Sequence, residues 1–242
     1  MKTALIQYKG KAAGILRETL CRYMKIEYFL DMLKTKELYV GQKCSFDDLS
    51  EKNLSFNDCP AFYLVDYTVS DSELKQDIKK KEELSNLYQE YSALPVSCWT
   101  HNTTENYFMW EVYASKYGVR IKATLQNILE NLDLSEYQVV CDKMIYRKYF
   151  PRTKIENLMF YKKIYFQDEK EFRFYFAPQT DETICLLNEK EHLNLKIRNP
   201  VEMIDEVMIS PFIHDSSCLK NILIDKFGFE KKQIKHSQIK LN

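Results

Sequence analysis

Residues whose types and spacing could support chemistry are concentrated between positions 161 and 176, in YKKIYFQDEKEFRFYF. Side chains of an extended strand alternate between two faces, so Glu171, Arg173 and Tyr175 would share one face and three phenylalanines the other. The phenylalanines would anchor the strand in a core, and the opposite face would then hold a carboxylate and a guanidinium in fixed positions. The alternative is a half-buried strand with a polar face in water, where Glu169 and Arg173 form a surface ion pair of little energetic value.

The composition limits the classes of protein and cofactor site. The chain has 242 residues, enough for one large domain or two small ones with a substantial core. Its 35 basic and 35 acidic side chains indicate neither a nucleic-acid nor a membrane partner. Only five glycines occur, and neither G-x-G-x-x-G nor G-x-x-x-x-G-K-[ST] is present. Rossmann and P-loop nucleotide sites are therefore not expected.

Cysteine and histidine usage bears on location and metals. The seven cysteines are scattered singly, without a C-x-x-C pair, and no secretory start precedes them, which predicts reduced thiols in a cytoplasmic protein. The four histidines lack H-x-x-x-H and H-E-x-x-H spacing, so no zinc site is expected. No apolar run approaches the roughly 18 residues of a membrane span, and we expect no membrane partner.

The periodicity predicts one mixed α+β domain over residues 20–242, after an N-terminal extension over 1–19 of unknown role. A first unit consists of a strand at Leu20–Tyr23, a helix at 26–33 and a strand at Leu38–Gly41. A second unit consists of a strand at Val96–Trp99, a helix over 104–117 and a strand at 119–122. Thr103 or Thr104 would cap this helix, and Gly118 would end it.

The other predicted elements alternate more loosely along the chain. Between the two units we expect an acidic turn at 46–51, a strand at 61–67 and a long charged helix over 70–91. After them the pattern predicts helices at 125–132, 155–164 and 215–227, the last with Gly228 at its C′ position, and strands at 137–146, 183–187, 193–197, 207–210 and 238–241.

The ordered motifs resemble a known but uncharacterised bacterial domain family. The series LxRY, ELYVG, FDDxxE, SCWT, MWxxYA before GVRI, and FxxExEFR before a late VMIS is similar to that family's pattern of lYKY, eLwfs, FNDPFE, cFS, MWshYa with GvclgF, and yEkEyR. The match spans roughly Leu20 to Pro211, and MWEVYA at 109–114 is its clearest segment. That family in turn resembles the ADP-ribosyltransferase fold, above all bacterial toxins that modify nucleic acid, by the order and roles of its elements.

This resemblance implies a split sheet with flanking helices, NAD as the ADP-ribose donor, and no metal. It assigns the catalytic role to Glu171, although the choice between Glu169 and Glu171 rests on the strand phase alone. The positions that it assigns to NAD contacts are Arg22 or Tyr23 on the first strand and Ser97, Cys98 and Trp99 on the second. The chain departs from the pattern in having Arg-Tyr for Lys-Tyr and in lacking the Asn and Pro of FNDPFE, which leaves the NAD contact open.

The residue types suit this chemistry. Cleavage of the nicotinamide glycosidic bond builds positive charge on the ribose, and a fixed carboxylate such as Glu171 would stabilise that charge. An arginine such as Arg22 or Arg173 could hold the pyrophosphate with paired hydrogen bonds.

Four aromatic residues could stack on the nicotinamide or on a target base: Tyr23, Trp99, Trp110 and Tyr113. Core packing is the alternative for Trp110 and Tyr113, because both lie on the apolar stripe of their helix. A plain surface role is the alternative for Arg22.

The leading hypothesis is therefore an NAD-dependent ADP-ribosyltransferase that acts inside cells as a toxin or phage-defence effector, on RNA, DNA or protein, with an antitoxin or chaperone as a partner that restrains it. NAD hydrolysis without an acceptor is a close variant. The main alternative is a non-catalytic module of the same fold that senses a nucleotide or a phage protein. A weaker alternative is a Mg²⁺-dependent nuclease that would use Asp47, Asp48, Glu169 and Glu171.

Overall fold

Three phenylalanines at alternate positions, Phe172, Phe174 and Phe176, make strand β9 (Glu171–Pro178) the centre of the core. The computed structural model describes residues 6–8, 15–42, 94–148, 159–180 and 192–241. The three rings are almost fully buried and contact one another in series along the strand. The predicted apolar face of this strand is therefore confirmed.

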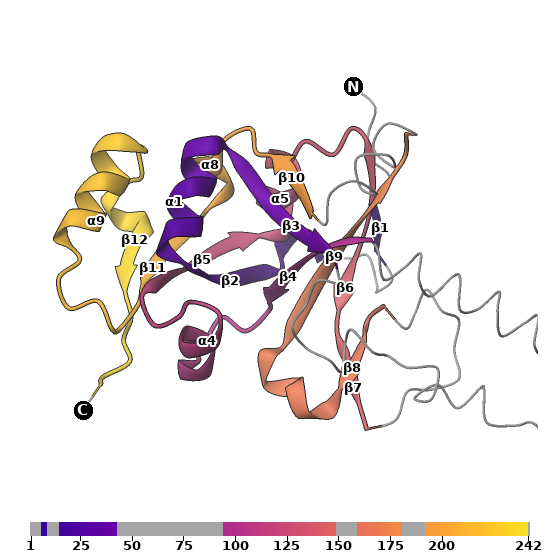
Figure 1. Cartoon of the computed structure of the whole chain (residues 1–242), viewed down its shortest axis with the longest axis horizontal. Coiled ribbons are helices and arrows are strands. Elements are labelled where there is room, and N and C mark those ends of the chain that lie inside the picture. The colour runs from indigo at the N-terminus through magenta and orange to yellow at the C-terminus, as the bar shows by residue number, and fades with distance from the viewer. Residues whose placement is uncertain (1–5, 9–14, 43–93, 149–158, 181–191, 242) are drawn as a thin grey trace, which may run out of the picture.

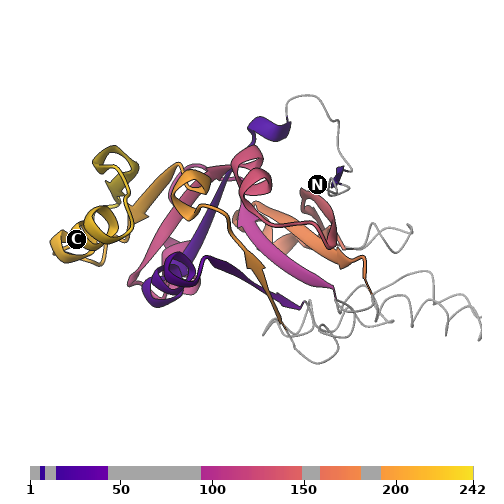
Figure 2. The same ribbon diagram turned by 90° about the horizontal axis from the view of Figure 1, so that it is seen from above.

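Within the described residues, nine other strands join β9 in one largely antiparallel sheet. They are β1 (Ile6–Tyr8), β2 (Thr19–Lys25), β3 (Glu37–Gln42), β4 (Pro95–Thr100), β5 (Gly118–Thr124), β6 (Tyr137–Lys143), β10 (His192–Lys196), β11 (Glu206–Ile209) and β12 (Ile234–His236). The main order is β1-β6-β9-β4-β2-β5-β11-β12, and Figure 2 shows it running from β12 near the C-terminus to β6 and β1 at the far end. The pairs β1–β6 and β11–β12 are parallel.

The sheet forks at β4. One edge of β4 pairs with β9 along its whole length from Val96 to Thr100. On the other edge, Pro95 and Val96 pair with β3, whereas Thr100 pairs with Cys21 of β2. The strand β10 extends the β3 branch, and β5, β11 and β12 extend the β2 branch. The residues of β4 between the two branches are 97–99.

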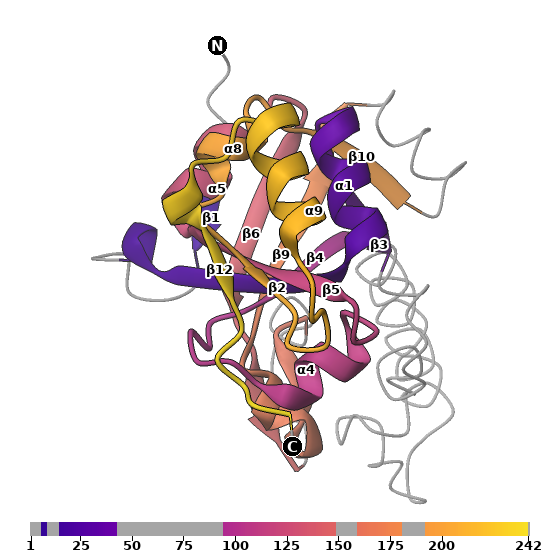
Figure 3. The same cartoon turned by 90° about the vertical axis from the view of Figure 1, so that its left-hand side faces the viewer.

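Helices cover both faces of the β2 branch. The helices α1 (Ile26–Thr35), α5 (Leu125–Asn131), α8 (Pro200–Met203) and α9 (Ser217–Asn221) lie on one face, and α4 (Tyr107–Val112) lies on the other (Figures 1 and 3). The first group closes the main core with the phenylalanines of β9. The helix α4 instead packs a smaller apolar cluster against β2 and β11. The predicted α+β class is confirmed, and no helix in the described ranges is long and apolar enough to span a bilayer.

The helix predicted over 104–117 is much shorter, and both of its predicted caps are wrong. Asn106 caps its start by accepting a hydrogen bond from the amide of Phe108. Gly118 begins β5 and does not end the helix. A Cβ atom at Gly118 would lie 2.2 Å from the carbonyl oxygen of Met24 on β2, so the close approach of two strands requires glycine here.

The segment before β9 was also predicted incorrectly. Its described part contains the strand β8 (Tyr161–Lys163) and the 3-10 helix η5 (Ile164–Glu169) where an α-helix up to residue 164 was expected. The strand predicted over 137–146 is divided at Met144 into β6 and β7 (Ile145–Arg147), and β7 pairs with β8 in a separate small sheet. These short elements satisfy their backbone groups through tertiary pairing, which periodicity does not reveal.

The two ends of the chain contribute strands to the sheet. Within the predicted extension, β1 pairs with β6, and a 3-10 helix, η1 (Ile15–Arg17), precedes β2. The last strand is β12 and not the predicted 238–241. The helix predicted over 215–227 is confirmed as α9 with its π-helical continuation η6 (Ile222–Lys226), and Gly228 follows with a left-handed φ of 82°. The elements predicted at 46–51, 61–67, 70–91 and 183–187 lie outside the described residues.

Candidate functional site

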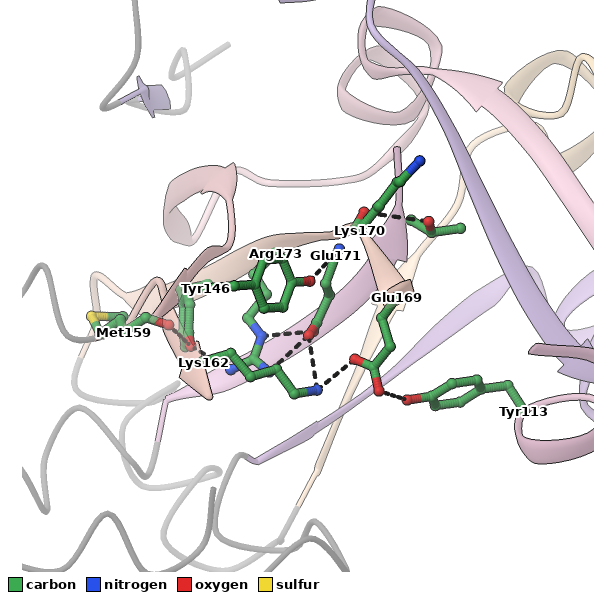
Figure 4. Close-up of polar contacts among 10 residues, drawn as sticks. Tyr113, Tyr146, Met159, Lys162, Glu169, Lys170, Glu171 and Arg173 are labelled. Carbon is green, nitrogen blue, oxygen red and sulfur yellow. Dashed lines mark hydrogen bonds and ion pairs between the residues drawn. The ribbon is translucent and has the colours of Figure 1, made fainter. Parts of the chain in front are cut away.

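A left-handed residue brings two glutamates together. The helix η5 ends at Lys170, which has a φ of 44°, and β9 begins at the next residue. Because of this turn, the side chains of Glu169 and Glu171 both point toward Lys162 on β8 (Figure 4). Such a backbone conformation is costly for a residue with a side chain. The juxtaposition of the two carboxylates is therefore built into the backbone.

Four buried charges form a single cluster, consisting of Lys162, Glu169, Glu171 and Arg173. The Nζ atom of Lys162 lies 2.6 Å from Oε2 of Glu169 and 3.2 Å from Oε2 of Glu171. Arg173 donates from Nε to Oε1 of Glu171 at 2.6 Å and from Nη2 to Oε2 at 3.0 Å, which is a bidentate pair. We call these residues the four-charge cluster; its two positive and two negative charges balance.

The neighbouring cations shift the pKa values of the two carboxylates to different extents. Burial raises the pKa of Glu169, and the single cation Lys162 does not offset this. Burial also raises the pKa of Glu171, but Arg173 and Lys162 together more than reverse the effect and hold it at about 2. Glu171 is therefore an ionised carboxylate at neutral pH, as a residue that stabilises a developing cation must be.

Three tyrosines surround the cluster. Tyr113, just after α4, donates its hydroxyl to Oε1 of Glu169 at 2.9 Å. Tyr146 on β7 accepts a hydrogen bond from the backbone amide of Glu171 at 2.7 Å, and Tyr175 donates to the Met159 carbonyl at 2.7 Å. Among these three tyrosines, Tyr113 is the most exposed, with 41 % of the residue's surface in solvent.

Sequence reasoning missed Lys162 and Tyr146. Both lie in segments whose elements were predicted incorrectly, one as a helix and the other at the end of a longer strand. A strand over 161–163 places Lys162 on the opposite face from Tyr161 and Lys163. In the structure, Lys162 is buried and its two neighbours are only partly buried. That alternation is the signal that was available.

The predicted contacts on β4 do not share the face of Glu171. Directly paired residues of neighbouring strands lie on the same face of a sheet. Ser97 pairs with Phe174 and Trp99 with Phe172, so both point toward the main core. Cys98 pairs with Arg173 and therefore shares the face of the four-charge cluster. Its thiol is hydrogen-bonded to Glu171 and contributes to the low pKa of that carboxylate.

Arg22 lies where β2 and β4 separate. Its Nη1 donates to the Ser97 hydroxyl at 3.2 Å, and the Trp99 indole Nε1 donates to the same oxygen at 3.0 Å. Within the described ranges, Ser97 is the one hydrogen-bond partner of Arg22, and no carboxylate pairs with it. Burial lowers the pKa of Arg22, and the nearby Cys98 partly offsets this. Cys98 is thus hydrogen-bonded to Glu171 and also acts electrostatically on Arg22.

The remaining predicted contacts, Tyr23 and Trp110, pack against each other. Their ring centroids are 4.8 Å apart in an edge-to-face arrangement, and the Tyr23 hydroxyl accepts a hydrogen bond from the Asn106 amide at 3.1 Å. Trp110 is fully buried in the cluster beneath α4. Both residues position α4, and through it Tyr113.

Two of the four carboxylates considered for a Mg²⁺ site, Asp47 and Asp48, lie outside the described residues. In the part of the chain that the structure describes, no group of three or more metal-ligating side chains is present. Glu169 and Glu171 are instead paired with cations, so the Mg²⁺ hypothesis gains no support from their geometry.

No protein-family model matches the chain, and no curated protein or solved structure matches it. The chemistry of the four-charge cluster and of the fork therefore carries the functional inference.

Proposed function

We propose that the protein is an NAD-dependent ADP-ribosyltransferase that acts inside cells as a toxin or phage-defence effector, with Glu171 as its catalytic carboxylate. The observation that carries this proposal is an ionised Glu171, oriented by the bidentate Arg173, on the strand next to β4, where Arg22 donates to the Ser97 hydroxyl and has no carboxylate partner in the described ranges. A cation without a carboxylate partner and an ionised carboxylate at one fork of a sheet suit a ligand that carries both a pyrophosphate and a reacting ribose. The fork itself supports the split-sheet architecture that the sequence resemblance implies.

Arg22 is the group that would bind the pyrophosphate. A guanidinium bound only to a hydroxyl keeps donors for an anion, and its planar fork matches two phosphate oxygens. Desolvation makes an unpaired guanidinium costly, so an anionic ligand would recover the lost interaction energy. In this proposal Ser97 and Trp99 position Arg22 and do not touch the ligand.

Glu171 would stabilise the ribose cation that forms as the nicotinamide leaves. A carboxylate has about four lone-pair positions, and those of Glu171 face Arg173, Lys162 and Cys98. Among the contacts of Glu171 with Lys162 and Arg173, the 3.2 Å contact with Lys162 is the longest, and it is the one that a ribose hydroxyl would replace. Lys162 would then remain paired with Glu169 at 2.6 Å.

Arg173 is assigned a positioning role and not the predicted NAD contact. Its guanidinium is almost fully buried and bidentate to Glu171, so it holds the carboxylate ionised and correctly oriented. Tyr113 is the aromatic residue best placed to contact the nicotinamide or the acceptor, because it is half-exposed and bonded to Glu169. Trp110 has no ligand contact in this proposal, because it is fully buried.

The test is inducible expression in bacteria of the wild type, Glu171→Gln and the matched control Glu169→Gln, with growth, cellular NAD, and the masses of total RNA, DNA and protein as readouts. We expect the wild type to stop growth and leave an ADP-ribose adduct that Glu171→Gln abolishes. Thermal melting of each purified variant distinguishes lost chemistry from lost folding. Loss of NAD without any adduct would indicate hydrolysis, and an adduct that persists in Glu171→Gln would move the catalytic role to Glu169.

The ion pairs of Glu171 with both Lys162 and Arg173 favour a second candidate function. This candidate is a non-catalytic module that senses a nucleotide or a phage protein. Glu171 is 5 % exposed and already paired with two cations, as a purely structural group would be. In that case NAD or another nucleotide would bind through Arg22 without turnover. A growth effect that survives Glu171→Gln but not Arg22→Met, with no adduct in either, would support this candidate over the transferase.

A further inference from the structure

We propose that the outer side of α4 binds a second copy of this chain, in a symmetric contact across a two-fold axis. This surface comprises Tyr107, Phe108, Val112 and Tyr117, with Phe212 packed beside them, and we call it the α4 face. Among the described helices that cover the β2 branch, α4 lies alone on its side (Figures 1 and 3). The proposal concerns assembly of the chain and does not depend on the proposed function.

The exposed apolar side chains of α4 lie on the side that faces away from the sheet. Met109 and Trp110 are buried in the cluster beneath the helix, whereas Phe108 is 53 % and Val112 50 % exposed. Positions four apart are neighbours on one side of a helix, so Phe108 and Val112 form a continuous outer stripe. Single exposed apolar side chains are ordinary, but a group of them indicates an interaction surface.

A rigid turn after α4 extends this surface. Ser115 and Lys116 both have left-handed backbones, with φ of 47° and 67°, which is costly for residues with side chains. The Lys116 amide donates to the Trp110 carbonyl at 2.9 Å, and the Lys116 carbonyl accepts a hydrogen bond from the Ser210 hydroxyl. The turn presents Tyr117 with 62 % of its surface in solvent. A surface that is already held in one conformation loses little entropy on binding, so the α4 face is a preformed interface.

The charges of the α4 face make it complementary to itself. Between residues 106 and 117 the charged side chains are Glu111 and Lys116, one of each sign, and their charged atoms lie 3.5 Å apart. Tyr107 donates its hydroxyl to Glu111 at 3.1 Å, and Lys116 Nζ lies 5.6 Å from the centroid of the Phe212 ring. In a two-fold contact the same patch of both copies meets itself. Glu111 of each copy would therefore face Lys116 of the other.

A second copy suits this balanced charge better than a strongly charged partner. Anionic lipids and other phosphate-rich surfaces require an excess of basic side chains, and here one cation lies beside one anion. Aromatic residues such as tyrosine and phenylalanine are enriched at protein interfaces. The helix α4 is followed by Tyr113, which is bonded to Glu169, so the second copy would lie at the border of the four-charge cluster.

The experiment is sedimentation velocity of the purified full chain without NAD, over about 2–200 μM, the range in which a modest interface dissociates. We expect the wild type to change from monomer to dimer within this range. Phe108→Ala and Tyr117→Ala should each raise the dimer dissociation constant at least about tenfold, because each removes two side chains from a symmetric contact. The matched control is Tyr28→Ala on α1, which is also 62 % exposed and should change the constant less than about twofold.

An exchange of charges tests the two-fold geometry. Glu111→Lys and Lys116→Glu should each weaken self-association at least about tenfold, because like charges then face each other across the axis. An equimolar mixture of these two variants should restore the dimer, since each altered side chain meets an opposite charge on the other variant. Mixing cannot repair the internal pair between Glu111 and Lys116, so restoration reports contact between copies. Thermal melting of each variant verifies that it is folded.

Four outcomes would overturn the proposal. The first three are a wild type that stays monomeric over the whole range, equal losses in the Tyr117 and Tyr28 variants, and a charge-exchange mixture that stays monomeric. The fourth is a monomeric wild type that sediments with neutral phosphatidylcholine vesicles and loses this binding in Phe108→Ala, which would make a lipid surface the occupant. A dimer that forms while no ADP-ribose adduct appears in cells leaves this proposal intact and removes the transferase, so the two are separable.

Discussion

Two arginines of this sheet, the buried Arg173 and the partly buried Arg22, show two different uses of one residue type. Arg173 is bidentate to Glu171 and also donates from Nη1 to the Tyr175 hydroxyl at 3.4 Å. Arg22 has a hydroxyl, that of Ser97, as its one hydrogen-bond partner in the described ranges. The first arginine completes a structural cluster, and the second retains donors for an anion. In the proposed function, the paired guanidinium supports the catalytic carboxylate, and the guanidinium without a carboxylate partner binds the ligand.

The largest expected effect on stability is that of Arg173→Met. This change leaves Glu171 buried without its principal partner, and breaking such a pair costs about 3–5 kcal/mol. Urea unfolding monitored by circular dichroism measures the loss. The control is Arg198→Met at an exposed position, for which we expect a change within about 0.5 kcal/mol. Similar losses in both variants would contradict the support role of Arg173.

The next effect is the pH dependence that Glu171 contributes. Its folded pKa of about 2 lies below the ordinary 4.5, so its stabilisation is present above pH 4.5 and is lost as the pH falls toward 2. Over that window the loss amounts to about 3 kcal/mol. Unfolding free energies of the wild type and Glu171→Gln, measured between pH 5 and the lowest pH at which both fold, should converge as the pH falls.

Glu169 supplies the matched control of opposite sign. Its folded pKa is raised above the ordinary 4.5, so its contribution is present below pH 4.5 and is lost as the pH rises through the folded value. Glu169→Gln should therefore gain stability relative to the wild type as the pH rises above 4.5. If both variants shift the pH profile in one direction, the two carboxylates do not have the separate environments described.

A smaller effect is expected for Tyr113→Phe. The substitution removes the hydroxyl that donates to Glu169 and keeps the ring, so the loss should be about 1 kcal/mol. The same hydrogen bond lowers the pKa of Glu169, so that pKa should rise further in the variant. Thermal melting at pH 5 and pH 7.5 would show a larger loss at the higher pH.

The smallest stability effect is expected for Arg22→Met. Only a hydrogen bond to a hydroxyl is lost, and Ser97 keeps its bond from Trp99, so we expect a loss below about 1 kcal/mol. Ligand affinity should respond in the opposite sense, with at least a tenfold loss of NAD binding in calorimetry, since hydrogen bonds to charged groups contribute about 1.5–3 kcal/mol. A destabilisation as large as that of Arg173→Met would make Arg22 a structural residue.

Local pattern predicted some elements well and others poorly. Strands β2, β4 and β9 and helix α1 were predicted within a few residues, because alternating or helical apolar spacing bounded by turns is a local property. The segment 159–169 was predicted wrongly, because its strand is short and pairs with β7 over a longer stretch of chain. Asn106 was missed as a cap because two threonines with the same capacity precede it.

The candidate site also combines features that local pattern predicts with features that depend on tertiary structure. The amino-acid sequence by itself determined that Glu171, Arg173 and Tyr175 share a face of one strand opposite three phenylalanines, since alternation is a property of any extended chain. Only the tertiary structure decided that Lys162 joins the two glutamates, that Ser97 and Trp99 face the core, and that Cys98 is hydrogen-bonded to Glu171. The physical reason is that strand register and a single left-handed residue set which faces meet, and neither is encoded in periodicity.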